Sequence, residues 1–416
     1  EGPKRAAGGT PGPGQGSIRA GPVPTRGSRP HGPLAGKDGA LWYTGQMINA
    51  LGRLDPKTGQ FKEYRLKTPH SGPHGLTEDR AGNVWFTGNN KALIGKLDPK
   101  TGAVTEYRMP DPAARDPHTL VFDQSGILWF TVQNGNMVGR LDPKIGDVKL
   151  LTMPAPKSRP YGMAVNSKGL VFVVEFGANR VASIDPKSLQ IREFPLPDAG
   201  ARPRRIAITS DDVVWDSDFA RGYLGRLDPA TGKVTEWLSP GGPKSQPYAM
   251  AASKDVIWYC ETGTKPNTVV RFDPKTEKFQ TWVIPSGGDI VRNMDVTRDG
   301  NFVLATSTIN GVALVQVASF EERHGSAAAL PALGGPPTGS GERKSVGHNG
   351  EGMMLTLAEA WHWVQIGFCA ALGAGIILAP IAAMSQGQPR PDPESPEYPE
   401  PHCSRCCPHM DDPDDI

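Results

Sequence analysis

An aromatic residue inside an apolar run recurs seven times along this chain at a nearly constant interval. The steps between successive copies are 43, 44, 43, 43, 43 and 44 residues. The seven positions are Trp42, Trp85, Trp129, Phe172, Trp215, Trp258 and Phe302. A period in the low forties, with short strands and turn residues between the copies, is typical of a β-propeller with one blade per repeat. We therefore expect an all-β fold, a seven-bladed propeller of four-stranded blades.

The second repeat shows the order of strands that we expect in each blade. A first strand opens at Pro73–Leu76, and a second strand at Val84–Thr87 is rich in β-branched and aromatic residues. A third strand follows at Leu93–Leu97, and an outer strand at Val104–Met109 alternates apolar with polar residues. The turn between them reads Asp-Pro-Lys-Thr-Gly, in which Pro presets φ and Gly accepts a positive φ.

The seventh repeat stops after three strands, the last of them at Gly311–Val317. An open sheet edge invites pairing with other chains, so the ring must be closed by another segment. Residues Ile18–Pro24 precede the first blade at the place of an outer strand. We predict that this segment pairs with the seventh blade, although its prolines restrict the pairing.

The flanks differ in composition from the repeats. We expect residues 1–16 to be a disordered Gly/Pro-rich leader, 17–318 the propeller, and 319–352 a linker. The segment 353–386 contains Val364–Met384, 21 residues in which Gln365 is the only polar side chain. Such a run is long enough for a transmembrane helix. The tail 387–416 is Pro-rich, acidic and expected to be disordered.

Two interpretations of residues 353–386 remain open. Trp361 and Trp363 precede the apolar run as interfacial aromatics would, which favours a membrane anchor. Met353 or Met354 would also be a plausible first residue of another protein, which favours a translated piece of a neighbouring gene. We expect a periplasmic or secreted protein, membrane-anchored if this segment spans a bilayer.

The overall charge excludes one class of partner. The chain has 45 basic and 43 acidic residues and a net charge of +2, so it lacks the basic field that nucleic-acid binding requires. Within the repeats, Cys260 is the only cysteine, so no disulfide framework holds the fold. We expect a monomer that binds a small-molecule or cyclic peptide ligand.

Several phrases of the repeat resemble the virginiamycin B lyase (streptogramin lyase) family. They are Ser71–Leu76, Val84–Thr87, Leu93–Leu97 and Val174–Arg180. The resemblance covers about residues 28–318. It implies a site at one mouth of the channel, where the ester of a cyclic depsipeptide antibiotic is opened by elimination. It also implies a His acid/base and Mg²⁺ held by Glu side chains, since a metal can stabilise charge that develops after proton removal.

In that family the catalytic His follows the Pro that opens a blade, ten or eleven residues before the aromatic. The equivalent residues here are His31, His74, His118, Tyr161, Arg204, Tyr248 and Arg292. This polar, aromatic and cationic set suits an anionic or carbonyl-rich ligand. The resemblance implies that His74 and His118 are the catalytic candidates. His31, Tyr161, Arg204, Tyr248 and Arg292 are then the substrate-binding candidates.

The family's metal-binding Glu stands about three residues after the aromatic. The equivalent residues are Gly45, Gly88, Val132, Glu175, Asp218 and Glu261. Glu175 and Glu261 are therefore the candidate Mg²⁺ ligands. The family has His and Glu in the same blade, whereas no blade of this chain has both. The nearest pair is His118 with Glu175, in neighbouring blades.

Two functions remain open on these observations. One is a carbon–oxygen lyase that opens a cyclic ester by metal-assisted elimination. The other is a ligand- or protein-binding propeller that lacks the family's His/Glu pair. The three Pro-His pairs fit catalysis, ligand contact without catalysis, or a hydrogen bond to the backbone of a neighbouring blade.

Overall fold

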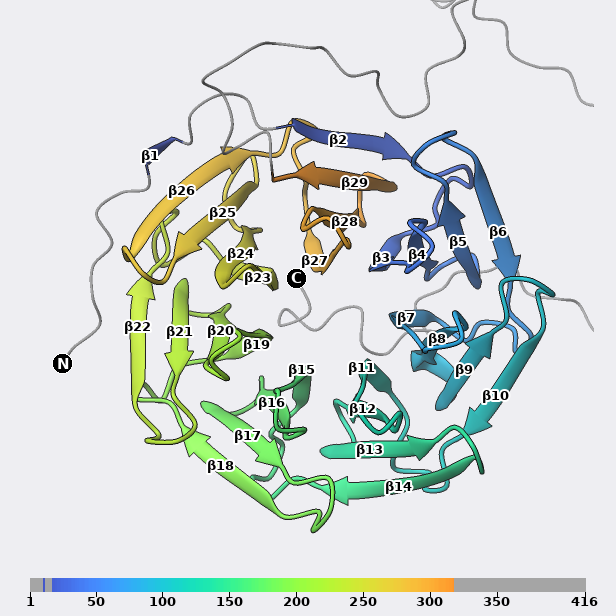
Figure 1. The fold of residues 1–416 in the computed structure, drawn as a ribbon, viewed down its shortest axis with the longest axis horizontal. Coiled ribbons are helices and arrows are strands. Elements are labelled where there is room, and N and C mark those ends of the chain that lie inside the picture. Colours follow the sequence, from blue (N-terminus) through green and yellow to red (C-terminus); the bar gives the residue numbers. More distant parts are fainter. Residues whose placement is uncertain (1–9, 12–16, 318–416) are drawn as a thin grey trace, which may run out of the picture. The chain divides into compact units, whose positions relative to one another are not determined.

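The repeats form seven antiparallel sheets arranged in a ring around one axis (Figure 1). The computed structural model describes residues 10–11 and 17–317, which lie in the first of two units, Glu1–Gly335. The second unit, Pro336–Ile416, lies outside the described residues. The predicted seven-bladed, all-β propeller is therefore confirmed. The expected linker, membrane segment and acidic tail fall outside the part of the chain that the structure describes.

Each blade is a four-stranded meander that runs from the axis outwards. The inner strands are β3 (Pro30–Ala35), β7 (Pro73–Glu78), β11 (Pro117–Phe122), β15 (Pro160–Val165), β19 (Pro203–Ile208), β23 (Pro247–Ser253) and β27 (Val291–Val296). The second strands are β4 (Leu41–Gly45), β8 (Val84–Gly88), β12 (Leu128–Val132), β16 (Val171–Glu175), β20 (Val214–Asp218), β24 (Val256–Glu261) and β28 (Phe302–Thr306).

The two remaining strands of each blade form its outer half, towards the rim. The third strands are β5 (Ala50–Leu54), β9 (Leu93–Leu97), β13 (Met137–Asp142), β17 (Arg180–Ile184), β21 (Tyr223–Leu227), β25 (Thr268–Asp273) and β29 (Gly311–Gln316). The outer strands of blades 1–6 are β6 (Phe61–Arg65), β10 (Val104–Arg108), β14 (Asp147–Thr152), β18 (Ile191–Pro195), β22 (Val234–Leu238) and β26 (Lys278–Val283). A single 3₁₀ turn, η1 (Asn89–Lys91), connects β8 to β9.

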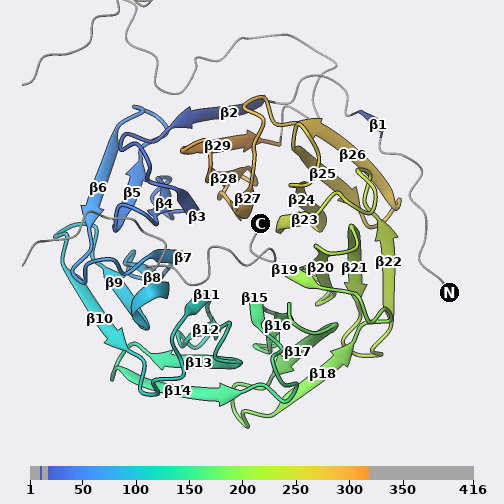
Figure 2. The ribbon, with the colours of Figure 1, turned by 180° about the vertical axis from the view of Figure 1, so that it is seen from behind.

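The ring is closed by the N-terminal segment, as predicted. Strand β2 (Ser17–Pro22) pairs antiparallel with β29, from Ser17 opposite Gln316 to Pro22 opposite Gly311. Figure 2 shows β2 at the rim beside β29, where blade 7 lacks an outer strand of its own. Within the predicted disordered leader, the two-residue strand β1 (Thr10–Pro11) pairs in parallel with β26. Residues 1–9 and 12–16 lie outside the described residues.

The recurring tryptophans pack between blades. Trp85, Trp129, Trp215 and Trp258 are fully buried. The indole N–H groups of Trp85 and Trp129 donate to Asp79 and Asp123, at 2.9 and 2.8 Å. A buried indole N–H needs such a partner, and the large apolar body supplies most of the contact between sheets.

A hydroxyl two residues after the aromatic links neighbouring blades. In blade 2, the Thr87 Oγ1 accepts from the Gly75 N–H at 2.9 Å and donates to the His118 carbonyl of blade 3 at 2.8 Å. Thr44, Thr131 and Ser217 make the same pair of bonds. In blades 4, 6 and 7 the position holds Val174, Cys260 and Leu304. We call these Thr and Ser side chains the hydroxyl links.

No helix among residues 10–11 and 17–317 has the length and apolar character needed to cross a membrane. The predicted membrane segment, 353–386, lies outside these ranges and stays a prediction.

Candidate functional site

A backbone irregularity lies at the start of every inner strand, and in blades 1–4 and 6 the residue after the opening Pro lies at the axis. The pairing of every inner strand with its second strand shifts just after its first residue, as between Pro30 and Pro33 in blade 1. A β-bulge of this kind re-aims side chains at strand ends. A Cβ at Gly32 would lie 2.3 Å from the His74 carbonyl oxygen, so glycine lets the inner strands of blades 1 and 2 approach closely.

Five of the seven predicted ring residues meet at one end of the channel. Neighbouring ring centroids are 3.7 Å apart for His31 and His74, 3.9 Å for His74 and His118, and 4.1 Å for His118 and Tyr161. The hydroxyls of Tyr161 and Tyr248 lie 2.5 Å apart. All five side chains are buried. We call His31, His74, His118, Tyr161 and Tyr248 the channel ring.

The two predicted arginines have different surroundings. Arg204 is fully buried, and its guanidinium lies 4.1 to 5.2 Å from the rings of four aromatic residues. These residues are Tyr161, Phe176, Phe219 and Tyr248. This arrangement is a cation–π cage. Arg292 lies near the channel ring, since its charge acts on His31 and His74.

Arg205, which the sequence prediction did not include, crosses the channel end. Its Nε–H donates to the Arg292 carbonyl at 2.9 Å and its Nη1–H donates to the Thr119 Oγ1 at 3.0 Å. Blades 7 and 3 are thereby joined by a side chain from blade 5. The sequence held one signal, since the position after the ring residue is Gly, Thr, Ala or Asn in the other blades but Arg here.

A cavity of about 290 Å³ runs along the inner strands, and the five channel-ring residues are absent from its lining. Most of its lining residues are apolar by type, and Arg205, Thr119, Asn293 and Asp295 are among its polar residues. A smaller cavity of about 30 Å³ lies against His31, His74, Arg205 and Asn293. The predicted ring thus forms the closed end of a channel rather than an open mouth.

The three histidines are held neutral by their surroundings. Burial lowers the pKa of His31, His74 and His118 well below the usual value, and nearby positive charges lower it further. Arg205 acts on all three imidazoles. The His118 Nδ1 lies 3.0 Å from the Thr119 Oγ1. Neutral imidazoles are chemically able to accept a proton, which a general base requires.

The predicted metal ligands do not lie at the cavity. Glu261 is buried, and its Oε1 accepts from the Ser239 hydroxyl at 2.5 Å and the Gly241 N–H at 2.6 Å. Its Oε2 accepts from the Thr268 hydroxyl at 2.6 Å. Glu261 therefore fastens the connection between blades 5 and 6 onto β24 and β25.

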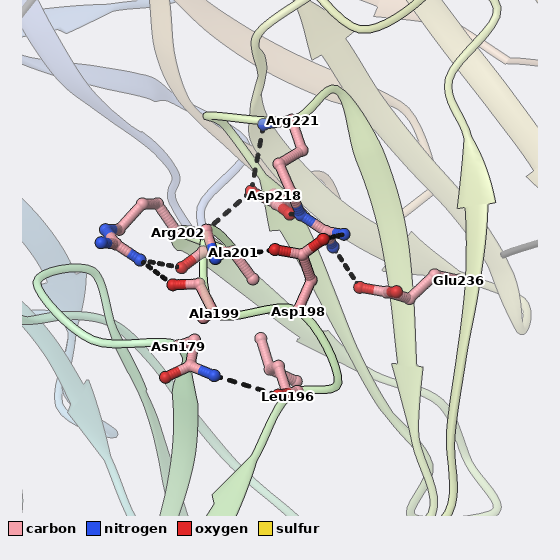
Figure 3. A network of polar contacts seen from close by, with 10 residues as sticks. Asn179, Leu196, Asp198, Ala199, Ala201, Arg202, Asp218, Arg221 and Glu236 are labelled. Atoms are coloured by element: carbon pink, nitrogen blue, oxygen red, sulfur yellow. Dashed lines mark hydrogen bonds and ion pairs between the residues drawn. The ribbon is translucent and has the colours of Figure 1, made fainter. Parts of the chain in front are cut away.

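Asp218 occupies the equivalent position in blade 5 and has a similar structural role. Figure 3 shows Asp218 accepting from the Arg202 N–H at 2.9 Å and from the Arg221 Nε–H at 2.6 Å. Arg221 also pairs with Asp198 at 3.2 Å and with Glu236. This network joins the connection between blades 4 and 5 to the outer half of blade 5.

Glu175 differs from both equivalents, because neither of its buried carboxylate oxygens has a hydrogen bond of normal geometry. Burial, followed by the charge of Glu193, raises the pKa of Glu175 to about 7, against smaller opposing effects of Ser158 and Arg180. Glu175 is absent from the lining of both cavities, whereas the predicted partner His118 contacts His74, Tyr161 and Thr119.

The donor set does not fit the Mg²⁺ implied by the resemblance. Magnesium prefers near-octahedral oxygen ligands and is commonly held through one or two carboxylates. Both oxygens of Glu261 are engaged with protein donors. Among residues 17–317, no group of three or more His, Cys, Asp or Glu side chains gathers to hold a metal ion. We assign no step to a metal at Glu175 or Glu261.

Comparisons with solved structures agree with the observed ring of blades. A streptogramin B lyase is 25% identical over 72% of this chain and 97% of its own, with a TM-score of 0.66. Virginiamycin B lyase from Staphylococcus aureus is 24% identical over 72% of this chain and 99% of its own, with a TM-score of 0.66. A catalytically inactive form of that enzyme with quinupristin is 24% identical over 72% and 100%, with a TM-score of 0.65.

None of the curated proteins compared with the chain matches its sequence. The model of the Virginiamycin B lyase family matches residues 13–272, which is more than half of the 416 residues. That match spans the segment that closes the ring, the first five blades and the inner part of blade 6 as far as β25. On its sequence and its fold, this chain belongs to the virginiamycin B lyase family.

Proposed function

We propose that this protein binds a small anionic or carbonyl-rich ligand at the closed end of its channel. The observation that carries the proposal is the position of Arg205, a buried guanidinium that lines both cavities. Within residues 17–317, Arg205 donates to a carbonyl and a hydroxyl and has no carboxylate partner. A buried cation without a counter-charge is costly, and a ligand carboxylate would offset that cost.

The electrostatics of the channel end support an anionic group there. The charges of Arg29, Arg159, Arg204, Arg205 and Arg292 all act to lower the pKa of one or more histidines of the channel ring. Positive charge in a low-dielectric cleft attracts anions and stabilises developing negative charge. Tyr161 and Tyr248 add hydroxyl groups at the same end.

A second candidate function is the carbon–oxygen lyase reaction on a cyclic ester. The neutral state of the channel histidines favours it, because His74 or His118 would serve as the base that removes a proton α to a carbonyl. The electron pair would then form a carbon–carbon double bond while the carbon–oxygen bond breaks. Arg205 and Arg292 would stabilise the developing charge. A related propeller has been solved in an inactive form with quinupristin.

The remaining expectations are untested and stay predictions. They are a monomeric state, a periplasmic or secreted location, and a small-molecule or cyclic peptide ligand. A cyclic depsipeptide would contact only the end of a cavity of about 290 Å³, which lies at the lower limit of small-ligand pockets.

Calorimetry with lactoyl-valine, a dipeptide-sized acid with one carboxylate, one amide carbonyl and one hydroxyl, tests the binding proposal. We expect binding to the wild type that weakens about tenfold or more in Arg205→Met, because a charge-assisted hydrogen bond is lost. Arg53→Met is the matched control, since Arg53 pairs with Asp38 outside the cavity lining. Equal affinity in the wild type and Arg205→Met, or no binding to either, would contradict the proposal.

Incubation with quinupristin, followed by mass spectrometry, tests the lyase candidate. Elimination opens the ring without a change of mass and creates a double bond, whereas hydrolysis adds one water. We expect ring opening at constant mass that is lost in His74→Ala or His118→Ala. Intact quinupristin after prolonged incubation would leave the binding propeller as the better account.

A further inference from the structure

The cavity of about 290 Å³ that Arg205 lines is also lined by an acidic residue. Asp295 lies on β27 in blade 7 and lines the cavity of about 290 Å³. Its Oδ2 accepts from the Ala35 N–H of blade 1 at 2.8 Å, and its Oδ1 accepts from the Val296 N–H at 2.9 Å. These bonds fix the carboxyl group across the seam between blades 7 and 1.

Asp295 has no cationic partner among residues 17–317. Its two hydrogen bonds are both to backbone N–H groups, and it forms no ion pair in that range. Burial, followed in the same direction by the charge of Glu78, raises the pKa of Asp295 to about 6, against the lowering effect of the two N–H groups. The carboxyl is therefore mostly ionised at pH 7, in a site that would gain from a cation.

The two charges face one cavity without meeting. The Arg205 Nε–H lies against the Arg292 carbonyl, and Asp295 follows three residues later on the same strand. At about 3.3 Å per residue, and with the bulge between Val291 and Met294 shortening the rise, the two levels are at most about 10 Å apart along the channel. Opposite charges that line one cavity and do not contact each other are both incompletely compensated.

The inner-strand residues between these levels include Leu34, Leu76, Leu120, Met163, Met250 and Met294. These side chains are buried in the hydrophobic clusters between blades, so they leave little apolar surface in the channel. A few convergent charged groups then fix the orientation of a ligand. A ligand that matches this channel has an opposite charge at each end of a short chain.

We infer that the channel recognises a zwitterion the size of a short peptide with free termini, its carboxylate at Arg205 and its ammonium group at Asp295. Two residues of extended chain span about 7 Å. With a hydrogen bond of about 2.8 Å at each end, that length is comparable to the separation of the two levels. This inference rests on the proposed function, because it assigns the anionic group of the ligand to Arg205 and adds the second contact.

Three matched probes test the inference on the full chain at pH 7, where an α-amino group is mostly protonated. Alanyl-valine carries both charges, lactoyl-valine has a hydroxyl in place of the ammonium group, and alanyl-valinamide lacks the carboxylate. We expect alanyl-valine to bind about tenfold or more tightly than either analogue in calorimetry, since each charge-assisted contact contributes that much.

Asp295→Asn tests the acidic contact, with Asp38→Asn as its control. Asp38 is an exposed carboxylate paired with Arg53, so its loss changes the net charge equally without altering the cavity. In Asp295→Asn we expect alanyl-valine to fall to the affinity of lactoyl-valine, while lactoyl-valine binds as in the wild type. Asp38→Asn should keep the full preference for alanyl-valine.

The outcomes separate the two proposals. Equal binding of alanyl-valine and lactoyl-valine to the wild type would overturn the zwitterion inference and leave the anion site at Arg205 intact. An unchanged preference in Asp295→Asn would also overturn it. Failure of all three probes to bind would overturn the inference together with the proposed function. Thermal unfolding of each variant checks that lost binding does not reflect lost folding.

Discussion

Blades 1–3 and blades 4–6 share one fold but distribute polar chemistry differently. Blades 1–3 place a histidine in the channel ring and a Gly or Val at the end of the second strand. Blades 4–6 place Tyr or Arg at the first position and an acidic residue at the second. In blades 5 and 6 that acid holds an inter-blade connection. In five blades the ring position contributes to the channel ring, whereas the acidic position of blades 5 and 6 serves the structure between blades.

The largest loss of stability is expected at Glu261, because both of its carboxylate oxygens accept hydrogen bonds. Glu261→Ala removes the acceptor of the Ser239 hydroxyl, the Gly241 N–H and the Thr268 hydroxyl. Buried donors without a partner cost about 1–3 kcal/mol each, so we expect the free energy of unfolding to fall by roughly 3–5 kcal/mol. Urea denaturation measures the loss. A loss below 1 kcal/mol, comparable to Asp38→Ala at the surface, would show that Glu261 does not hold the connection.

Replacing Glu175 is expected to change the free energy of unfolding in the opposite direction, because its carboxylate has no such donors. Its pKa is raised to about 7 from 4.5, so the charged form costs stability above pH 7 and the cost disappears as the pH falls towards 4.5. We expect Glu175→Gln to raise the free energy of unfolding by about 2–3 kcal/mol at pH 8. The gain should shrink steadily at pH 6 and pH 5.

Denaturation of the wild type and Glu175→Gln across this pH range checks the prediction. Burial is the first cause of the raised pKa, so the difference between the two proteins must follow the titration of a single group. A variant that is destabilised equally at pH 5 and pH 8 would mean that Glu175 accepts a structural contact like that of Glu261.

A smaller effect is expected at the hydroxyl links. Thr87→Val removes the acceptor of the Gly75 N–H and the donor to the His118 carbonyl, at nearly constant volume. We expect a loss of about 1–2 kcal/mol in urea denaturation. Val174 occupies the equivalent position in blade 4 and offers the control. Val174→Thr adds a hydroxyl that can make the same two hydrogen bonds, so it should lower stability less than Thr87→Val does. Equal stability of Thr87→Val and the wild type would show that the hydroxyl links do not stabilise the fold.

The sequence predicted the fold and the ring because both depend on a repeat. The spacing of Trp42 and its equivalents defines the blades, and the Pro before each ring residue marks the start of an inner strand. The closing strand β2 was predictable because the seventh repeat lacks one strand. These features follow from local sequence and from the need to leave no open edge.

The side chains in and around the channel were less predictable from the sequence. At the bulge in β19, the Arg204 side chain lies in the aromatic cage and the Arg205 side chain lies in the channel. Residue spacing alone does not determine which of these two neighbouring side chains faces the channel. Asp295 lies deeper in the channel, beyond the positions to which the family resemblance drew attention. The donors around Glu261 come from the connection between blades 5 and 6, whose path the repeat does not define.

Calorimetry of lactoyl-valine in the presence of Mg²⁺ and in the presence of EDTA tests the central claim, that the ligand binds at Arg205 in the channel and not at a metal held by the acids. The account predicts the same affinity under both conditions, with the loss in Arg205→Met unchanged. Binding that requires Mg²⁺, is abolished by EDTA and is lost in Glu175→Gln would contradict it and place the site at the carboxylates instead.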